Sequence, residues 1–193
     1  PSLERSEVNV DLLRASRKVD GVTVIDLYAE YPDYRIDIQR EQQRLCEHDA
    51  VVFMFPLYWY STPALLKEWQ DLVLEYGFAY GAEGTALQGK PFLCAITAGG
   101  SEKAYRADGY NHFTLRELLA PLEQTATLTG MHYLAPFALF GSRTALDEGR
   151  VAAHISDWVR VLTALRDGNL DLQQAMTLPK LKDGLDAIVG GAA

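Results

Sequence analysis

The hydrophobic and polar residues of this chain predict short buried strands separated by amphipathic helices. Five apolar residues from Val51 to Phe55 form a run of the length typical of a buried strand, and residues 92–97 form a second such run. Residues 22–27 are rich in β-branched side chains and predict another strand. Residues 133–140 predict a further strand that Pro136 interrupts.

Helical periodicity fills the segments between these strands. The predicted helices cover residues 6–18, 37–47, 63–76, 114–128 and 147–166. Asp37 is an expected N-cap, and Thr62-Pro63 reads as an N-cap followed by proline at the first helical position. The apolar tail from Gly168 could add a helix or pack on a neighbouring subunit. We therefore expect one domain over residues 1–167 and a C-terminal extension over residues 168–193.

The alternation of helices and strands is typical of an α/β doubly wound parallel sheet. In the flavodoxin-like strand order 2-1-3-4-5, the first strand lies between the second and the third. This chain begins with a helix, so residues 22–27 would lack an inner neighbour and would leave buried amides unpaired. We therefore expect a first strand upstream of Pro1.

Composition and charge narrow the function classes. The 193 residues include 18 basic and 26 acidic side chains, and the net charge of −8 argues against nucleic acid as the main partner. No apolar run reaches the roughly 20 residues that span a bilayer, and no signal-peptide pattern is present. Cys46 and Cys94 form no CxxC motif and are expected to be small core residues. These features favour a cytoplasmic protein.

Three loops of the predicted sheet end at the same edge, where ligands of such folds bind. The first loop, residues 1–9, places Ser2, Ser6 and Asn9 at the amino end of a helix, which suits a phosphate group. The alternative is that Ser6 only caps the helix. No GxGxxG or P-loop motif occurs, which argues against a dinucleotide Rossmann site or a nucleotide triphosphatase.

The other two loops suit the flat ring of a flavin. Leu57-Tyr58-Trp59-Tyr60 offers aromatic faces and backbone amides, and its alternative is an aromatic dimer interface. Thr97-Ala98-Gly99-Gly100 allows close approach of backbone amides to the ring, and its alternative is a plain turn.

The motifs of the chain resemble the flavodoxin-like NAD(P)H:quinone oxidoreductase family. They are most similar to the small ancillary flavoproteins of Kef-type, glutathione-regulated potassium-efflux systems. The resemblance rests on segments in one collinear order: Pro1…Ser6…Asn9, Asp26-Leu27-Tyr28, Tyr31-Pro32-Asp33, Ile36-Asp37, Pro56-Leu57-Tyr58-Trp59-Tyr60-Ser61, Pro63-Ala64-Leu65-Leu66-Lys67, Gly77-Phe78-Ala79-Tyr80-Gly81, Gly84 to Lys90, and Thr97-Ala98-Gly99-Gly100.

The resemblance implies a homodimer that binds one flavin per subunit, FMN or alternatively FAD. The flavin contacts it implies are Ser6, Glu7, Val8, Asn9, Leu57, Tyr58, Trp59, Tyr60, Thr97, Ala98, Gly99 and Gly100. A histidine that usually precedes the position of Pro1 is absent, Phe55 stands where histidine is frequent, and Ala98 replaces a threonine. The last two changes remove no backbone contact, so flavin binding is expected to survive both of them.

The family's larger members use a tyrosine and a histidine to stabilise charge on the reduced flavin. Tyr105 matches the tyrosine, whereas His112 lies one residue beyond the histidine position. Tyr105 and His112 are thus the candidate catalytic residues, with a surface role ahead of Thr114 as the alternative for His112. No metal site is expected from the spacing of the other histidines.

Three functions follow from these expectations. The first is hydride transfer from NAD(P)H to FMN and then two-electron reduction of a quinone. The second is a regulatory subunit that docks on a membrane potassium transporter, at the inner face of the membrane. The third is a flavodoxin-type electron carrier, which the aromatic loop disfavours.

Overall fold

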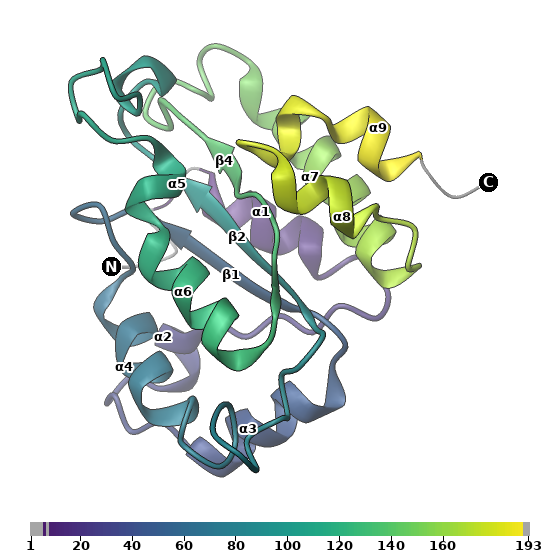
Figure 1. Ribbon diagram of the computed structural model, residues 1–193. Helices are drawn as coiled ribbons and strands as arrows, with labels where there is room; N and C mark the ends of the chain where they lie inside the picture. Colours follow the sequence, from purple (N-terminus) through teal and green to yellow (C-terminus); the bar gives the residue numbers. More distant parts are fainter. Residues whose placement is uncertain (1–5, 7, 191–193) are drawn as a thin grey trace.

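A four-stranded parallel sheet forms the centre of the computed structural model, which describes Ser6 and residues 8–190 (Figure 1). The strands are β1 (Val51–Pro56), β2 (Pro91–Thr97), β3 (His132–Tyr133) and β4 (Phe137–Leu139). β2 is central and pairs with β1 on one side and with both β3 and β4 on the other. Pro136 lies between β3 and β4, as the sequence predicts. The predicted parallel sheet of an α/β fold is therefore confirmed.

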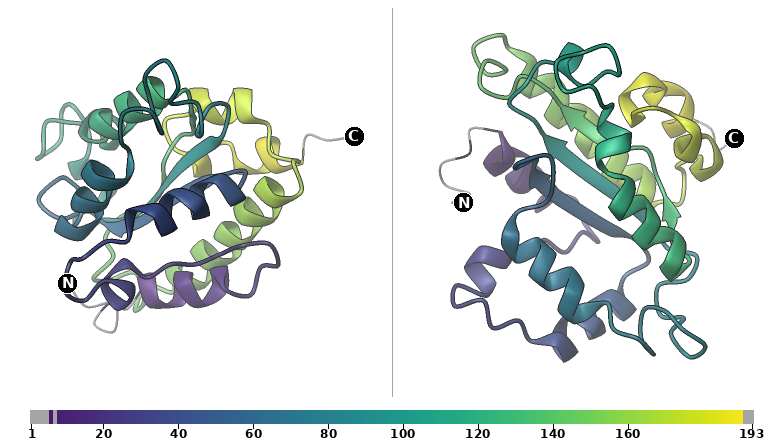
Figure 2. Two further views of the ribbon diagram at one scale, coloured as in Figure 1. Left: turned by 90° about the horizontal axis from the view of Figure 1, so that it is seen from below. Right: turned by 60° about the vertical axis from the view of Figure 1, so that its left-hand side comes forward.

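Helices cover both faces of the sheet (Figure 2). One face carries α3 (Ile38–Glu47), α4 (Ala64–Val73), α5 (Leu115–Leu118) and α6 (Ala120–Thr129). The other face carries α1 (Asn9–Ser16) and α7 (Arg150–Arg166). Each face of the sheet has its own hydrophobic core under these helices. Successive side chains of β2 point to opposite faces, so Phe92 and Cys94 join the core under α3 to α6, whereas Leu93 and Ala95 join the core under α1 and α7.

Local capping explains where several helices begin. The Asp37 side chain accepts a hydrogen bond from the Arg40 amide, and Thr114 forms a capping box with Glu117. The helix predicted over residues 114–128 is divided at Leu119, with a proline in the first turn of α6. The predicted cap at Thr62 is wrong, because Pro63 occupies the N-cap of α4 with an extended ψ of 150°.

The strand predicted over residues 22–27 is absent. Residues 22–26 pair with no strand in the described part of the chain, so their backbone joins no β-ladder despite the β-branched side chains. Asp26 instead caps α2 (Leu27–Glu30), and its carboxylate accepts hydrogen bonds from the Tyr28 and Ala29 amides. Only the 3-4-5 portion of the expected strand order is therefore present in the described residues. The strand expected before Pro1 lies outside them.

The C-terminal extension folds against its own chain rather than standing apart. It comprises α8 (Leu172–Thr177), a 3-10 turn (Leu181–Asp183) and α9 (Leu185–Val189), which cover α7 and β4 in Figure 1. Leu181 and Ile188 are completely buried. The Leu181 amide donates to the Pro136 carbonyl at 3.1 Å, and the Ala135 amide donates to the Ala175 carbonyl at 3.0 Å. These bonds fix the extension to the edge of the sheet.

Two further observations concern expectations from composition. Cys94 is buried as predicted, whereas the prediction for Cys46 is wrong because its side chain is exposed at the end of α3. Within residues 6 and 8–190, the structure contains no helix with the length and apolar character needed to cross a bilayer.

Candidate functional site

The three loops singled out from the sequence meet at one edge of the sheet. The Leu57 amide donates to the Thr97 carbonyl at 2.8 Å, which joins the second loop to the third. The buried side chain of Asn9 donates through Nδ2 to Thr97 Oγ1 at 3.0 Å, which joins the first loop to the third. Ser6 accepts a hydrogen bond from the Asn9 amide at 3.0 Å and so contacts the first turn of α1. Ser2 and Glu7 lie outside the described residues.

The second loop is a tight turn with a strained backbone. The amides of Tyr58 and Ser61 each donate to the carbonyl of the other, at 3.1 and 2.9 Å. Trp59 and Tyr60 between them have positive φ angles of 49° and 62°, as a type I′ turn requires. This position normally holds Asn-Gly, because a side chain in the left-handed region costs roughly 1–2 kcal/mol per residue. The Trp59 side chain is also 93% exposed. Strain combined with aromatic exposure points to a binding role.

The third loop is fixed by the strand beside it. The Ala98 amide donates to the Leu139 carbonyl at 2.9 Å, and the Gly141 amide donates to the Gly100 carbonyl at 2.8 Å. The amides of Gly99 and Gly100 donate to no acceptor within the part of the chain that the structure describes. The amides of Trp59 and Tyr60 are likewise without an acceptor there. Neighbouring loops thus present four backbone donors at this edge.

Tyr105 packs beside the third loop. Its ring lies 5.2 Å from that of Phe140 between centroids, and a Cβ on Gly100 would stand only 3.2 Å from Tyr105 Cε2. Partial burial raises the pKa of the Tyr105 hydroxyl above its ordinary value, so the phenol stays protonated at neutral pH. The Tyr105 ring therefore lies against the glycine turn and carries a protonated hydroxyl.

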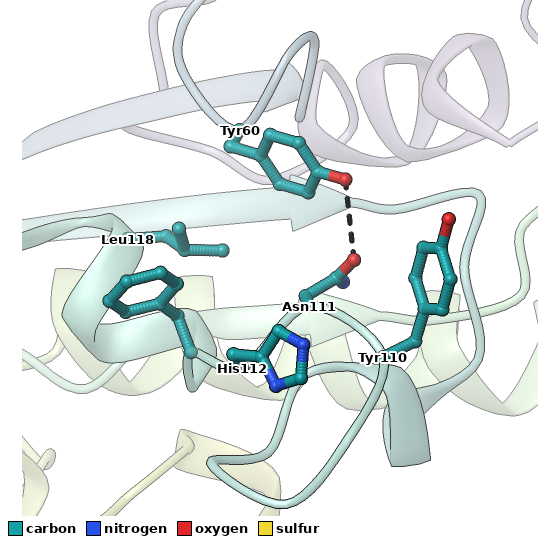
Figure 3. Close-up of a pocket in the computed structure, with 6 residues that line it drawn as sticks. Tyr60, Tyr110, Asn111, His112 and Leu118 are labelled. Carbon is teal, nitrogen blue, oxygen red and sulfur yellow. Dashed lines mark hydrogen bonds between the residues drawn. The ribbon is translucent and has the colours of Figure 1, made fainter.

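His112 lines a pocket of about 460 Å³ between the second loop and residues 110–118 (Figure 3). The Tyr60 hydroxyl donates to Asn111 Oδ1 at 3.3 Å and closes one side of the pocket. The full lining is Tyr60, Tyr110, Asn111, His112, Phe113 and Leu118. His112 has a positive φ of 60°, so the chain turns sharply at this residue. Sequence reasoning missed Asn111, because nothing in its spacing points to Tyr60.

Comparison with known proteins places the chain among flavodoxin-like proteins. The model of the Flavodoxin_2 family, described as a flavodoxin-like fold, matches residues 2–162. The chain belongs to this family. A Bacillus subtilis (strain 168) protein named uncharacterized NAD(P)H oxidoreductase YrkL is 46% identical over 142 residues, which are 74% of this chain and 82% of that protein.

A second relative is named as an ancillary protein of a potassium-efflux system. The glutathione-regulated potassium-efflux system ancillary protein KefG of Serratia proteamaculans (strain 568) is 47% identical over 162 residues, covering 83% of this chain and 88% of that protein. The resemblance stated from the sequence is therefore confirmed.

Two solved structures share the fold. The general stress protein 14 of Treponema denticola, in complex with FMN, is 39% identical with a TM-score of 0.80, and the match covers 86% of this chain and 94% of that one. An NADPH-quinone reductase from P. pentosaceus is 30% identical with a TM-score of 0.74, and the match covers 84% and 93% of the two chains.

Proposed function

We propose that this protein is an FMN-dependent NAD(P)H:quinone oxidoreductase. The observation that carries the proposal is the junction of three loops at one sheet edge, with four backbone donors beside an exposed aromatic turn. The FMN complex of the Treponema denticola relative and the name of the P. pentosaceus reductase support the same cofactor and reaction.

The chemistry of the site fits FMN. The ring system of a flavin needs hydrogen-bond donors for its carbonyl oxygens and nitrogens, and the amides of Gly99 and Gly100, which carry no side chain, would supply them. Trp59 and Tyr60 add two further amides and apolar faces. Ser6 and Asn9, together with Glu7 and Val8, would hold the phosphate at the amino end of α1. FMN itself supplies the hydride-accepting chemistry when bound.

The catalytic roles assigned to this chain's residues are hydrogen bonding and charge placement. Tyr105, with its protonated hydroxyl, would donate a hydrogen bond to a bound flavin and so favour its reduced form. His112 and Asn111 line a pocket whose volume suits a single nicotinamide or quinone ring. NAD(P)H and the quinone would use this pocket in turn, so the nicotinamide product must leave before the quinone enters.

We also propose that the protein forms a homodimer. Trp59 is 93% exposed, Tyr110 is 86% exposed and Phe113 is 54% exposed. Aromatic surface of this extent is unfavourable in water, and a second copy of the chain would cover it next to the pocket. Analytical ultracentrifugation of the flavin-loaded protein is expected to give twice the monomer mass, and a monomer at micromolar concentration would contradict this assignment.

Anaerobic reduction tests the proposed reaction. Purified protein loaded with FMN should lose its visible flavin absorbance when NADPH or NADH is added, and a soluble quinone should restore it. Retention of full absorbance with both nucleotides would overturn the oxidoreductase assignment. A protein that binds no FMN would overturn the cofactor assignment as well.

A regulatory role is the second candidate, and the match to the KefG ancillary protein favours it. In this role the acidic protein docks at the cytoplasmic side of a membrane potassium transporter, and its flavin serves folding more than turnover. Pull-down with the soluble domain of a Kef-type transporter tests the docking. Efflux measured with a variant that binds transporter but not flavin separates the two roles. Loss of binding to the transporter domain would exclude the second candidate.

A further inference from the structure

The Arg143 side chain lies next to the glycine turn of the third loop. Arg143 lies four residues after the end of β4 at Leu139, and its Nε lies 3.7 Å from the position that a Cβ on Gly99 would take. Its side chain is exposed, and no carboxylate of the described residues forms an ion pair with it. Arg150 on the same segment differs, because it is held by Glu148 and by the carbonyls of Phe140 and Gly141.

Backbone hydrogen bonds hold the segment around Arg143 against the third loop. The Ser142 amide donates to the Ala98 carbonyl at 3.0 Å, and the Gly141 amide donates to the Gly100 carbonyl at 2.8 Å. The two donors directly precede Arg143 in the chain, and the two acceptors lie on either side of Gly99. These bonds hold the backbone next to Arg143 against the third loop, within side-chain reach of Gly99.

A positive charge beside Gly99 would favour the reduced state of a bound flavin. Hydride transfer from NAD(P)H brings two electrons and one proton to the flavin ring, so the ring gains one negative charge while the nicotinamide leaves as a cation. Groups that place positive charge beside the ring stabilise this reduced form selectively. Of the two candidate catalytic residues, Tyr105 is a neutral hydrogen-bond donor and brings no positive charge. The other, His112, lines the pocket of Figure 3 with Tyr110 and Phe113.

We propose that Arg143 stabilises the reduced flavin by placing its guanidinium beside the ring at Gly99. This inference rests on the proposed function, because it requires a flavin above the glycine turn. The phosphate of NADPH is a second anionic group that an exposed arginine could bind. The redox potential of bound FMN and the nucleotide affinities distinguish the two.

The test is the two-electron midpoint potential of bound FMN, measured by spectroelectrochemistry together with the dissociation constant of oxidised FMN. Arg143→Met removes the charge and keeps the length of the side chain, and Arg143→Lys keeps the charge. Arg106→Met is the matched control, because Arg106 is an exposed arginine of the neighbouring loop that already pairs with Asp108 at 3.0 Å. The wild-type protein is measured alongside.

Arg143→Met should weaken binding of reduced FMN about tenfold relative to oxidised FMN, which lowers the midpoint potential by about 30 mV. Arg143→Lys should restore most of the difference, and Arg106→Met should leave the potential unchanged. An unchanged potential in Arg143→Met, or an equal shift in Arg106→Met, would overturn the inference. An unchanged potential with a selective loss of NADPH over NADH affinity would assign Arg143 to the nucleotide phosphate instead. Wild-type protein that binds no FMN would overturn the proposed function itself.

Discussion

Replacing Trp59 with glycine is expected to stabilise the flavin-free protein while it weakens flavin binding. Trp59 has a φ of 49°, and relief of this left-handed strain is worth roughly 1–2 kcal/mol. Glycine costs about 0.5–1 kcal/mol through the greater freedom of the unfolded chain. The Trp59 side chain is 93% exposed and buries little surface. The difference leaves a net gain of about 0.5–1 kcal/mol in the free energy of unfolding.

Urea unfolding followed by circular dichroism measures this gain, and two protein concentrations separate any contribution from a dimer. A gain of this size raises Tm by about 1–4 °C for a chain of this length. Tyr110→Gly is the matched control, because Tyr110 is 86% exposed but has no positive φ. This control should lose about 0.5–1 kcal/mol. If Trp59→Gly is destabilised as much as Tyr110→Gly, the reasoning from backbone strain is refuted.

Three further predictions concern other parts of the structure. Glu41→Ala should lower the free energy of unfolding by about 3–5 kcal/mol in urea titrations, because this buried carboxylate pairs with Arg44 and accepts hydrogen bonds from Tyr31 and Trp69. Burial lowers the pKa of His154 to about 4, so protonation favours the unfolded chain. Stability should therefore fall by about 3 kcal/mol between pH 6.5 and pH 4, with a flatter profile in His154→Leu. Asn9→Ala breaks the bond to Thr97 and should raise the dissociation constant of FMN about tenfold in fluorescence titrations.

Each of the three has an outcome that would contradict it. A loss below 1 kcal/mol in Glu41→Ala would mean that the buried carboxylate is not a stabilising centre between α3 and α4. Identical pH profiles for His154→Leu and wild-type protein would mean that other groups cause the acid instability. Unchanged FMN affinity in Asn9→Ala would mean that the link between the first and third loops does not shape the site.

The sequence predicts the sheet edge well because buried strands leave a local signal. The apolar runs of β1 and β2 are continuous, and parallel pairing brings their following loops together without further information. Residues 22–26 show the limit of this reasoning. Their β-branched composition satisfies strand propensity, but a strand also needs a hydrogen-bonded neighbour, and Asp26 stops the extended segment with a helix cap.

The sequence likewise predicts one part of the candidate site and not the other. The glycine turn and the aromatic loop are visible in the sequence, but the consecutive left-handed residues Trp59 and Tyr60 are not, because aromatic side chains do not predict a type I′ turn. The contact of Tyr60 with Asn111 joins residues 51 positions apart. Arg143 comes next to Gly99 through the pairing of β2 with β4 and the backbone bonds that continue beyond it. Such long-range neighbours leave no periodic signal along the chain.

The central claim is that the three loops form one FMN site, and equilibrium titration of the purified protein with FMN tests it most directly. Quenching of flavin fluorescence is expected to saturate at one FMN per chain. Gly100→Val, whose side chain would meet the Tyr105 ring, should weaken this binding at least tenfold, while Tyr76→Ala on the remote connection after α4 should not. Absence of saturable binding, or equal affinity in Gly100→Val and wild-type protein, would contradict the account.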